Sequence, residues 1–284
     1  MSLGLKYKNN EQIFVERQRG GVPYLSYPLL ENTGIVNHGF STRLGGVSTG
    51  CFSSMNLSFT RGDEESCVKE NYRRISDAMG FDMNSIVTSD QTHTNNVRKV
   101  TEKDRGKGIV IPRDYTDTDG MITNVPGLVL ATFYADCVPL YFADPANHAI
   151  GLSHSGWRGT VQKIGAVTIE KMSEEYGSDP KDLKVAIGPS ICQDCYEVSE
   201  DVIKKFRENY DENLWPEIFY QKENGKYQLN LWKANEFVFL ESGILPEHIA
   251  VTNVCTHCNP DILFSHRTTG NERGTLSAFL ALKK

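Results

Sequence analysis

The sequence predicts one mixed α/β domain in which strands and helices share a common core. Three observations favour this fold class. Apolar runs such as 127–133 and 138–142 are nearly continuous, which is typical of strands buried on both faces. Other segments place their apolar residues at helical spacing. The 284 residues contain no linker, repeat or low-complexity tract, so we expect a single domain over residues 1–284.

The first half of the chain is expected to be rich in strands. Residues 11–60 combine short apolar runs with glycine turns. A helix is predicted over 63–80, because acidic residues occupy its first turn and Gly80 provides a stop. Strands are predicted at 22–25, 35–40, 86–88 and 97–100.

The second half of the chain alternates strands with helices. After a strand at 149–153, apolar residues recur at helical spacing over 160–176, with Gly177 as the stop. Ser199 is expected to cap another helix, and a further helix is predicted over 231–241. The remaining predicted strands lie at 184–187, 249–252, 262–265 and 276–280.

Composition narrows the classes of protein to consider. The net charge is −6, and Lys and Arg do not gather into a block, which argues against a nucleic-acid-binding protein. No apolar run is long enough for a membrane helix, and the N-terminus does not resemble a signal peptide. Seven cysteines, an odd number, indicate reduced thiols. We therefore predict a cytoplasmic protein that binds neither nucleic acid nor membrane.

A thiol and two imidazoles are the candidate metal ligands. His93, Cys137 and His154 each end a predicted strand or lie just beyond one. Three His and Cys ligands with the fourth position open are typical of catalytic zinc. The open position lets zinc lower the pKa of a bound water or hold a substrate oxygen. From the residues alone, a buried free cysteine and two unrelated histidines are an equal alternative.

The turn Gly156-Trp157-Arg158-Gly159 beside His154 favours chemistry on an anion. It opens a predicted helix whose first N–H groups are unpaired and attract phosphate. Arg158 adds a cation, and Trp157 either stacks on a substrate ring or belongs to the core.

Four more side chains are candidates for the site. Arg43 lies in a Gly-rich turn, where its guanidinium either binds phosphate or is simply solvated. Asn56 is a polar residue inside an apolar run and a candidate substrate contact. Asp136, beside Cys137, and Asp119 are candidates for proton transfer.

The residues offer two alternative metal sites. The pairs Cys192/Cys195 and Cys255/Cys258 could form a closed zinc site, but they lie too far apart in the chain for a usual zinc knuckle, so ordinary thiols are favoured. Copper also uses two His and one Cys, but a multicopper laccase needs more than seven histidines, arranged in His-x-His pairs that this chain lacks.

With these motifs identified, the chain resembles the laccase-like family of multicopper polyphenol oxidoreductases, whose members are also described as purine nucleoside phosphorylases. The resemblance covers most of the chain. It rests on His38-Gly39-Phe40-Ser41-Thr42-Arg43, Gln91-Thr92-His93, Ala135-Asp136-Cys137-Val138-Pro139, His154-Ser155-Gly156-Trp157-Arg158-Gly159 and Phe264-Ser265-His266-Arg267.

The resemblance implies a four-layer α/β/β/α sandwich and a zinc ion held by His93, Cys137 and His154. It also implies phosphorolysis of adenosine, inosine and methylthioadenosine, with adenosine deamination as a side activity. The leading hypothesis is therefore a zinc-dependent purine nucleoside phosphorylase that binds a nucleoside and phosphate as a monomer or homodimer. The alternatives are a copper-dependent polyphenol oxidase and a non-catalytic metal-binding partner protein.

Overall fold

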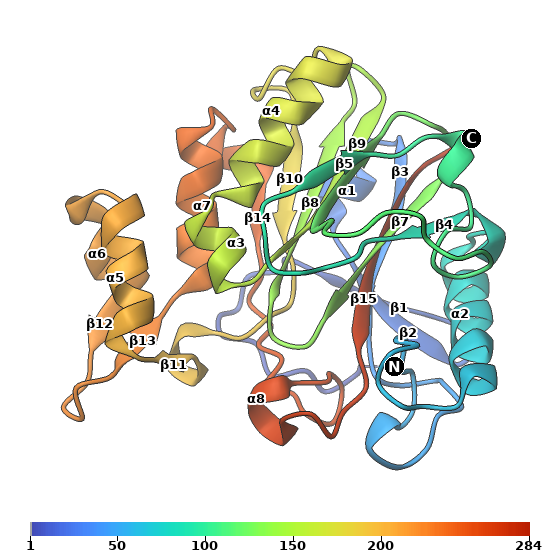
Figure 1. Cartoon of the computed structure of the whole chain (residues 1–284), viewed down its shortest axis with the longest axis horizontal. Helices are drawn as coiled ribbons and strands as arrows, with labels where there is room; N and C mark the ends of the chain where they lie inside the picture. Colours follow the sequence, from blue (N-terminus) through green and yellow to red (C-terminus); the bar gives the residue numbers. More distant parts are fainter. Residues whose placement is uncertain (1) are drawn as a thin grey trace.

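A computed structural model describes residues 2–284, and its core is a pair of six-stranded sheets packed face to face (Figure 1). The first sheet has the strand order β1 (Val15–Arg19), β2 (Val22–Ser26), β3 (Val36–Ser41), β15 (Leu276–Leu282), β7 (Val129–Tyr134), β4 (Ile86–Thr88). The second has the order β14 (Ile249–Val251), β10 (Lys184–Ile187), β8 (Val138–Asp144), β9 (Ala149–Ser155), β6 (Gly120–Thr123), β5 (Val97–Lys99).

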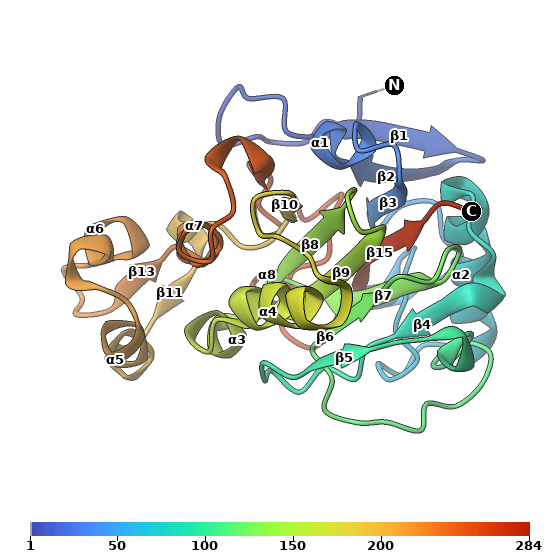
Figure 2. The same cartoon turned by 90° about the horizontal axis from the view of Figure 1, so that it is seen from above.

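Helices cover the outer faces of both sheets, as the view from above shows (Figure 2). Helix α2 (Glu65–Met79) packs on the first sheet, and α4 (Ile164–Tyr176) and α7 (Leu231–Glu241) pack on the second. The predicted four-layer α/β/β/α sandwich is confirmed. Among residues 2–284, no helix combines the length and apolar character that a membrane span requires. The predicted cytoplasmic location remains a prediction.

Strand β8 shows why the apolar runs are nearly continuous. Leu140 and Phe142 pack in the cluster that includes α4 and α7, whereas Tyr141 and Ala143 pack between the two sheets. Both faces of the strand are therefore buried, and neither set of alternate positions is free to be polar.

A smaller three-stranded sheet lies at one end of the molecule with two short helices (Figure 1). Its strands are β11 (Glu197–Val198), β13 (Tyr227–Leu229) and β12 (Phe219–Gln221), and its helices are α5 (Glu200–Asn209) and α6 (Trp215–Ile218). The other short helices are α1 (Pro28–Glu31), α3 (Trp157–Val161) and α8 (His266–Thr269). Single 3-10 turns are η1 (Gly50–Phe52), η2 (Met83–Ser85), η3 (Glu102–Asp104), η4 (Gln193–Cys195), η5 (Glu212–Leu214) and η6 (Pro246–His248).

Two of the predicted elements are wrong. The helix predicted over 160–176 is two helices, because Lys163 adopts a left-handed conformation (φ 54°) between α3 and α4. The strand predicted at 262–265 is a loop, in which the N–H groups of Ile262 and Leu263 both donate to the carbonyl of Asn259. Its last residue, Ser265, instead caps α8 by accepting a hydrogen bond from the N–H of Thr268.

Candidate metal centre and pocket

The structure brings His93, Cys137 and His154 together where the two sheets meet. His154 lies on β9, Cys137 in the turn that crosses from β7 in one sheet to β8 in the other, and His93 in the loop after β4. One ligand atom from each lies within 4.8 Å of the other two. Three such donors could hold a tetrahedral metal ion and leave its fourth position open.

Asp119 holds two of these candidate ligands in place. Its buried carboxylate lies 2.7 Å from His154 Nδ1 and accepts the backbone N–H groups of Thr92, His93 and Thr94. Burial alone raises the pKa of Asp119, but the hydrogen bonds from His154 and the backbone outweigh it and lower the pKa to about 2. An ionised Asp119 accepts the Nδ1 proton of His154, so Nε2 is the nitrogen that would bind a metal once its own proton is released.

The loop that carries His93 is shaped by the same carboxylate. His93 has a left-handed backbone conformation (φ 66°), which residues other than glycine rarely adopt. This conformation allows three successive N–H groups to converge on Asp119, and their hydrogen bonds offset its cost.

The electrostatics of the ligand set favour a thiolate. Burial raises the pKa of Cys137, but the neighbouring His154 and His93 outweigh burial and lower it to about 6. Burial lowers the pKa of His154, but the Cys137 thiolate and Asp119 outweigh it and raise the pKa to about 9. A deprotonated sulfur is the form that binds metal.

Gly156 leaves room for these ligands. A Cβ added at this position would lie 3.0 Å from His93 Cδ2 and 3.1 Å from Cys137 Sγ. Any larger residue would therefore press on two of the three ligands, which accounts for the glycine between His154 and α3.

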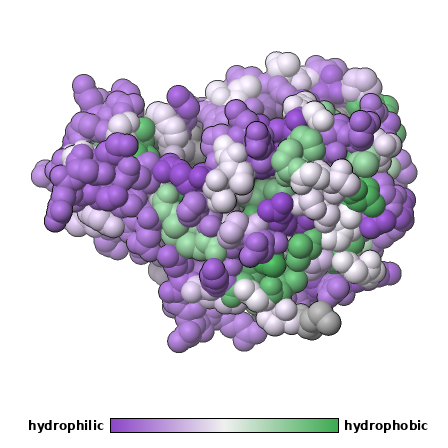
Figure 3. Space-filling view, turned by 90° about the horizontal axis from the view of Figure 1, so that it is seen from below, coloured by the Kyte–Doolittle hydropathy of each residue, from purple (hydrophilic) through white to green (hydrophobic). Residues whose placement is uncertain are grey.

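The three ligands open into a pocket of about 1060 Å³. Its walls combine aromatic and apolar side chains with several arginines. Helix α8 contributes His266 and Arg267 and projects downward in Figure 1. Figure 3 shows the molecule from that side, where hydrophobic residues gather in the middle of the face among hydrophilic ones. A pocket of this size accommodates a drug-sized organic ligand and an anion together.

Of the predicted substrate residues, the structure brings Arg158 to the pocket but not Arg43 or Asn56. Arg158 stacks on Trp157, with its guanidinium carbon 4.4 Å from the ring centre. The guanidinium of Arg43 donates to the carbonyls of Ser53 and Pro260 and lies over Phe264.

Asn56 is fully buried and has a structural role. Its Nδ2 donates to the carbonyl of Ser58 and to Asp63, and its Oδ1 accepts the N–H groups of Ser58 and Thr275. All its hydrogen-bonding groups are engaged within the protein, away from the pocket.

Asp136 lines the pocket, but both of its carboxylate oxygens are engaged. Oδ1 accepts the hydroxyl of Thr256 at 2.6 Å, and Oδ2 accepts the N–H of Arg267 at 2.7 Å. These bonds hold Asp136 at a φ of 94° and fix the turn that presents Cys137.

The pocket also contains four arginines that were not predicted as site residues, namely Arg61, Arg113, Arg267 and Arg273, of which Arg61 and Arg273 bear on anion binding. Arg273 is 7% exposed, and its Nε has no hydrogen-bond partner among residues 2–284. Burial and the nearby charge of Arg61 lower its pKa to about 10, which still leaves it charged at neutral pH. Neither arginine lies in a motif that marks it as functional, so no local signal could have found them.

Comparisons with known proteins agree with this architecture. Residues 37–283 match the family model described as multi-copper polyphenol oxidoreductase laccase. A protein of Bacillus subtilis strain 168 named purine nucleoside phosphorylase YlmD is 38% identical over 259 residues, which cover 89% of this chain and 91% of that protein.

Two solved structures share the fold. YlmD from Geobacillus stearothermophilus matches with a TM-score of 0.87 at 32% identity, covering 95% of this chain and 100% of its own. The hypothetical protein YfiH of Bacillus licheniformis matches with a TM-score of 0.87 at 33% identity, covering 94% of this chain and 99% of its own.

Proposed function

This chain belongs to the multi-copper polyphenol oxidoreductase laccase family, and we propose that it is a zinc-dependent purine nucleoside phosphorylase. Similar proteins with that activity in their names support an enzyme of this general type. The reaction joins a phosphate oxygen to C1′ of the ribose as the bond from C1′ to the base nitrogen breaks. The base leaves with the bonding electrons and takes up a proton, and the other product is ribose 1-phosphate.

The observation that carries this proposal is a buried, incompletely bonded arginine in the same pocket as the three-ligand centre. A buried guanidinium without its full set of partners is costly unless an anion completes it. Arg273 donates from one terminal nitrogen to the carbonyl of Gly274, while its Nε is unpartnered among the described residues. Phosphate matches this need, since it accepts paired hydrogen bonds from guanidinium groups.

Arg61 and Arg158 complete the proposed phosphate subsite. Arg61 lies near enough to Arg273 for the two positive charges to interact unfavourably, and a bound dianion would reverse the sign of that interaction. Arg158 lines the same pocket as Cys137 and His154. These arginines replace the predicted pairing of Arg43 with Arg158.

The remaining pocket wall suits a purine nucleoside. Phe133, Trp157 and Tyr196 line the pocket with aromatic surface on which a base can stack. Zinc held by His93, Cys137 and His154 would supply a Lewis acid to polarise or orient a substrate oxygen. Adenosine, inosine and methylthioadenosine are the proposed substrates, with deamination of adenosine as a side activity of the same centre.

For the two carboxylates we favour positioning roles over proton transfer. Asp119 has a pKa of about 2 and remains ionised at neutral pH, so it is a poor proton donor to a leaving base. Both oxygens of Asp136 accept hydrogen bonds from the protein. The proposed contribution of each is to hold the ligands and the pocket wall at fixed positions.

The experiment is incubation of the zinc-loaded protein with inosine, with and without phosphate, followed by chromatography of the free base. We expect hypoxanthine release that requires phosphate. Release that is absent, or equally fast without phosphate, would contradict phosphorolysis.

The family description favours a second candidate, a copper-dependent polyphenol oxidase, because two histidines and one cysteine also bind copper. Oxygen uptake with a phenol should be measured on copper-loaded and zinc-loaded protein side by side. Turnover of the phenol in proportion to bound copper, with no nucleoside cleavage by either form, would select the oxidase.

A further inference from the structure

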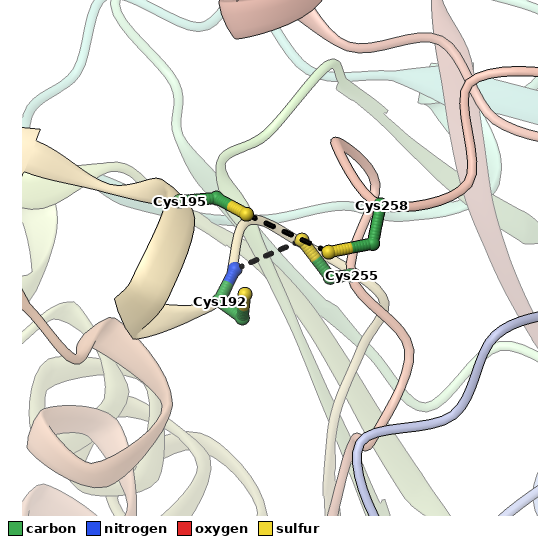
Figure 4. Close-up of side chains that lie close together, drawn as sticks. All are labelled: Cys192, Cys195, Cys255 and Cys258. Carbon is green, nitrogen blue, oxygen red and sulfur yellow. Dashed lines mark hydrogen bonds between the residues drawn. The ribbon is translucent and has the colours of Figure 1, made fainter.

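Four cysteines outside the pocket lie close together around one point (Figure 4). The sulfurs of Cys192, Cys195, Cys255 and Cys258 all lie within 4.8 Å of one another, and those of Cys195 and Cys258 are 3.5 Å apart. Four sulfurs at about 2.3 Å from one tetrahedral ion are separated by about 3.8 Å. A disulfide needs about 2.05 Å, and all seven cysteines are free.

The fold explains why these pairs meet although they are distant in the chain. Strands β10 and β14 are parallel neighbours, so the segments that follow them leave the sheet at the same end. The pairing continues beyond the strands, since Ser190 forms a bridge with Cys255 and accepts the N–H of Thr256 at its carbonyl. Both segments then reach a CxxC pair, which places the two pairs face to face.

We propose that Cys192, Cys195, Cys255 and Cys258 bind a second zinc ion in a closed, structural site of four thiolates. The ordinary thiols favoured from the sequence are replaced by this assignment, because strand pairing removes the objection of long separation along the chain.

The surroundings of the cluster suit a closed site. Cys192 and Cys255 are buried, and Cys195 and Cys258 are partly buried. Ile191 and Trp232 pack against the cluster and shield it from solvent. The backbone N–H of Cys192 lies 3.3 Å from the sulfur of Cys255, a hydrogen bond that stabilises a thiolate. A filled set of protein ligands leaves no open position for substrate, which distinguishes this site from the centre in the pocket.

A cation lies beside the cluster to offset its charge. Four thiolates around one Zn²⁺ carry a net charge of about −2. The ammonium group of Lys8 lies 2.9 Å from Asp194 and close enough to Cys192 and Cys258 for their charges to interact. Its backbone N–H donates to the carbonyl of Asn253, so the N-terminal segment is fixed against one of the two cysteine loops. The proposed ion would therefore join the two cysteine loops, and the N-terminal segment is held beside them by the contacts of Lys8.

The same loops support the turn that carries the ligand Cys137. The N–H of Ile191 donates to the carbonyl of Asp136, and the hydroxyl of Thr256 donates to the carboxylate of Asp136. Ile191 also lines the pocket. The four-cysteine site thus stabilises one wall of the pocket, although none of its cysteines lines the pocket.

The test is metal analysis of variants in which the pocket centre has been removed, so the result does not depend on the proposed phosphorylase activity. A His93→Ala/Cys137→Ala variant should retain about one zinc per chain, the ion of the closed site. Adding Cys195→Ser and Cys258→Ser should remove it. The matched control instead adds Cys51→Ser and Cys67→Ser to the His93→Ala/Cys137→Ala variant. These two cysteines lie outside the cluster, so the control should keep the zinc. No zinc in the His93→Ala/Cys137→Ala variant, or zinc that survives loss of Cys195 and Cys258, would overturn the proposal.

A measurement on the unaltered chain covers the case in which the variants do not fold. X-ray absorption at the zinc edge should give about two zinc ions per chain with an average of about 2.5 sulfur ligands each, from one four-sulfur site and one single-sulfur site. A thiol assay in denaturant should find all seven cysteines reduced once metal is chelated. One sulfur per zinc, or four cysteines tied up as two disulfides, would contradict a tetrathiolate site.

Discussion

Asp119 joins the strand and the loop that bear the two candidate histidine ligands. Its two carboxylate oxygens accept four hydrogen bonds from these segments, one from His154 Nδ1 and three from the backbone N–H groups of Thr92, His93 and Thr94. Local sequence could suggest only that a carboxylate lay near the site. Its role as an acceptor follows from tertiary contacts, because Asp119 directly precedes β6 and meets both that loop and His154 on β9.

We predict that Asp119→Asn weakens zinc binding at the pocket centre by about 10- to 100-fold, the effect usual for a metal ligand's hydrogen-bond partner. The NH₂ group of the new asparagine must face either His154 Nδ1 or the loop N–H groups. Since these groups are also donors, at least one of the present hydrogen bonds would be replaced by a repulsive contact. Competition titration with a chelator measures the affinity. The control Asp114→Asn changes an exposed carboxylate that pairs with Lys107 and should bind normally. Equal affinity in both variants would refute the role of Asp119.

Arg273 provides a second test at the level of one side chain. We predict that Arg273→Gln raises the KM for phosphate by about 10- to 100-fold, the loss of a charged hydrogen bond, with a smaller effect on the KM for nucleoside. Its melting temperature should not fall, because removing an incompletely paired buried charge relieves a desolvation cost. Steady-state kinetics with phosphate varied gives the answer.

The matched control for this substitution is Arg105→Gln, since Arg105 pairs with Glu102 outside the pocket. It should leave the KM for phosphate unchanged. A melting temperature that drops in Arg273→Gln while the KM stays at its original value would show that Arg273 supports the fold rather than phosphate binding.

At the scale of elements, β3 carries a histidine between the two sheets. His38 is buried, and its Nε2 accepts the N–H of Tyr27 at 2.8 Å. Burial is the main cause that lowers its pKa from 6.5 to about 4. The unfolded chain takes up a proton at this residue below about pH 6.5, whereas the folded chain does not until about pH 4, so stability decreases as the pH falls through this window.

We predict that the free energy of unfolding loses about 2 kcal/mol from this histidine alone between pH 7 and pH 5. A His38→Gln variant keeps an acceptor for Tyr27 but lacks the titration, so its urea-unfolding free energy should depend less on pH. His148→Gln removes an exposed histidine and should retain the original slope. Identical slopes for His38→Gln and the unaltered chain would contradict the assignment.

The sequence predicts an element well when the spacing of its apolar residues shows which of its faces are buried. The apolar run in β8 indicates a strand buried on both faces, and the structure confirms it. The run at 262–265 is also apolar, and Leu263 and Phe264 are buried, yet it is a loop. Phe264 is buried under Arg43 and against Gly274, so its burial comes from loop packing rather than from a strand. A run of apolar residues therefore indicates that the segment is buried, but it does not show whether the backbone N–H groups bond to a neighbouring strand.

At the scale of the whole molecule, the sequence pointed to the three candidate ligands but not to the groups around them. His93, Cys137 and His154 could be proposed because each ends a predicted strand or lies just beyond one and its residue type binds metal. Arg61 and Arg273 lie far apart in the chain, in segments that follow β3 and precede β15, and they meet because these two strands pair in the first sheet. The same is true of the two CxxC pairs, whose proximity depends on the parallel pairing of β10 with β14. The long-range contacts that build a site are set by topology, which local spacing does not encode.

The small third sheet is the part of the molecule that could fold separately, so it decides whether the chain is a single domain. Helix α5 packs its Ile203 and Phe206 into the same apolar cluster as α4 and α7, and the hydroxyl of Tyr210 donates to the carbonyl of Thr160 in α3. We therefore predict one cooperative unfolding transition in urea, with the same midpoint by circular dichroism and by tryptophan fluorescence. Two separated midpoints would show that residues 197–229 fold as an independent unit.

The most direct test of the central claim is ³¹P NMR of the zinc-loaded protein with inosine and phosphate. We predict conversion of inorganic phosphate to ribose 1-phosphate in equal amount to the base released. Cys137→Ala should abolish the conversion, and Cys67→Ala, which changes a partly buried cysteine on α2, should preserve it. Full conversion by a zinc-free Cys137→Ala protein, or no ribose 1-phosphate from the unaltered one, would contradict the account.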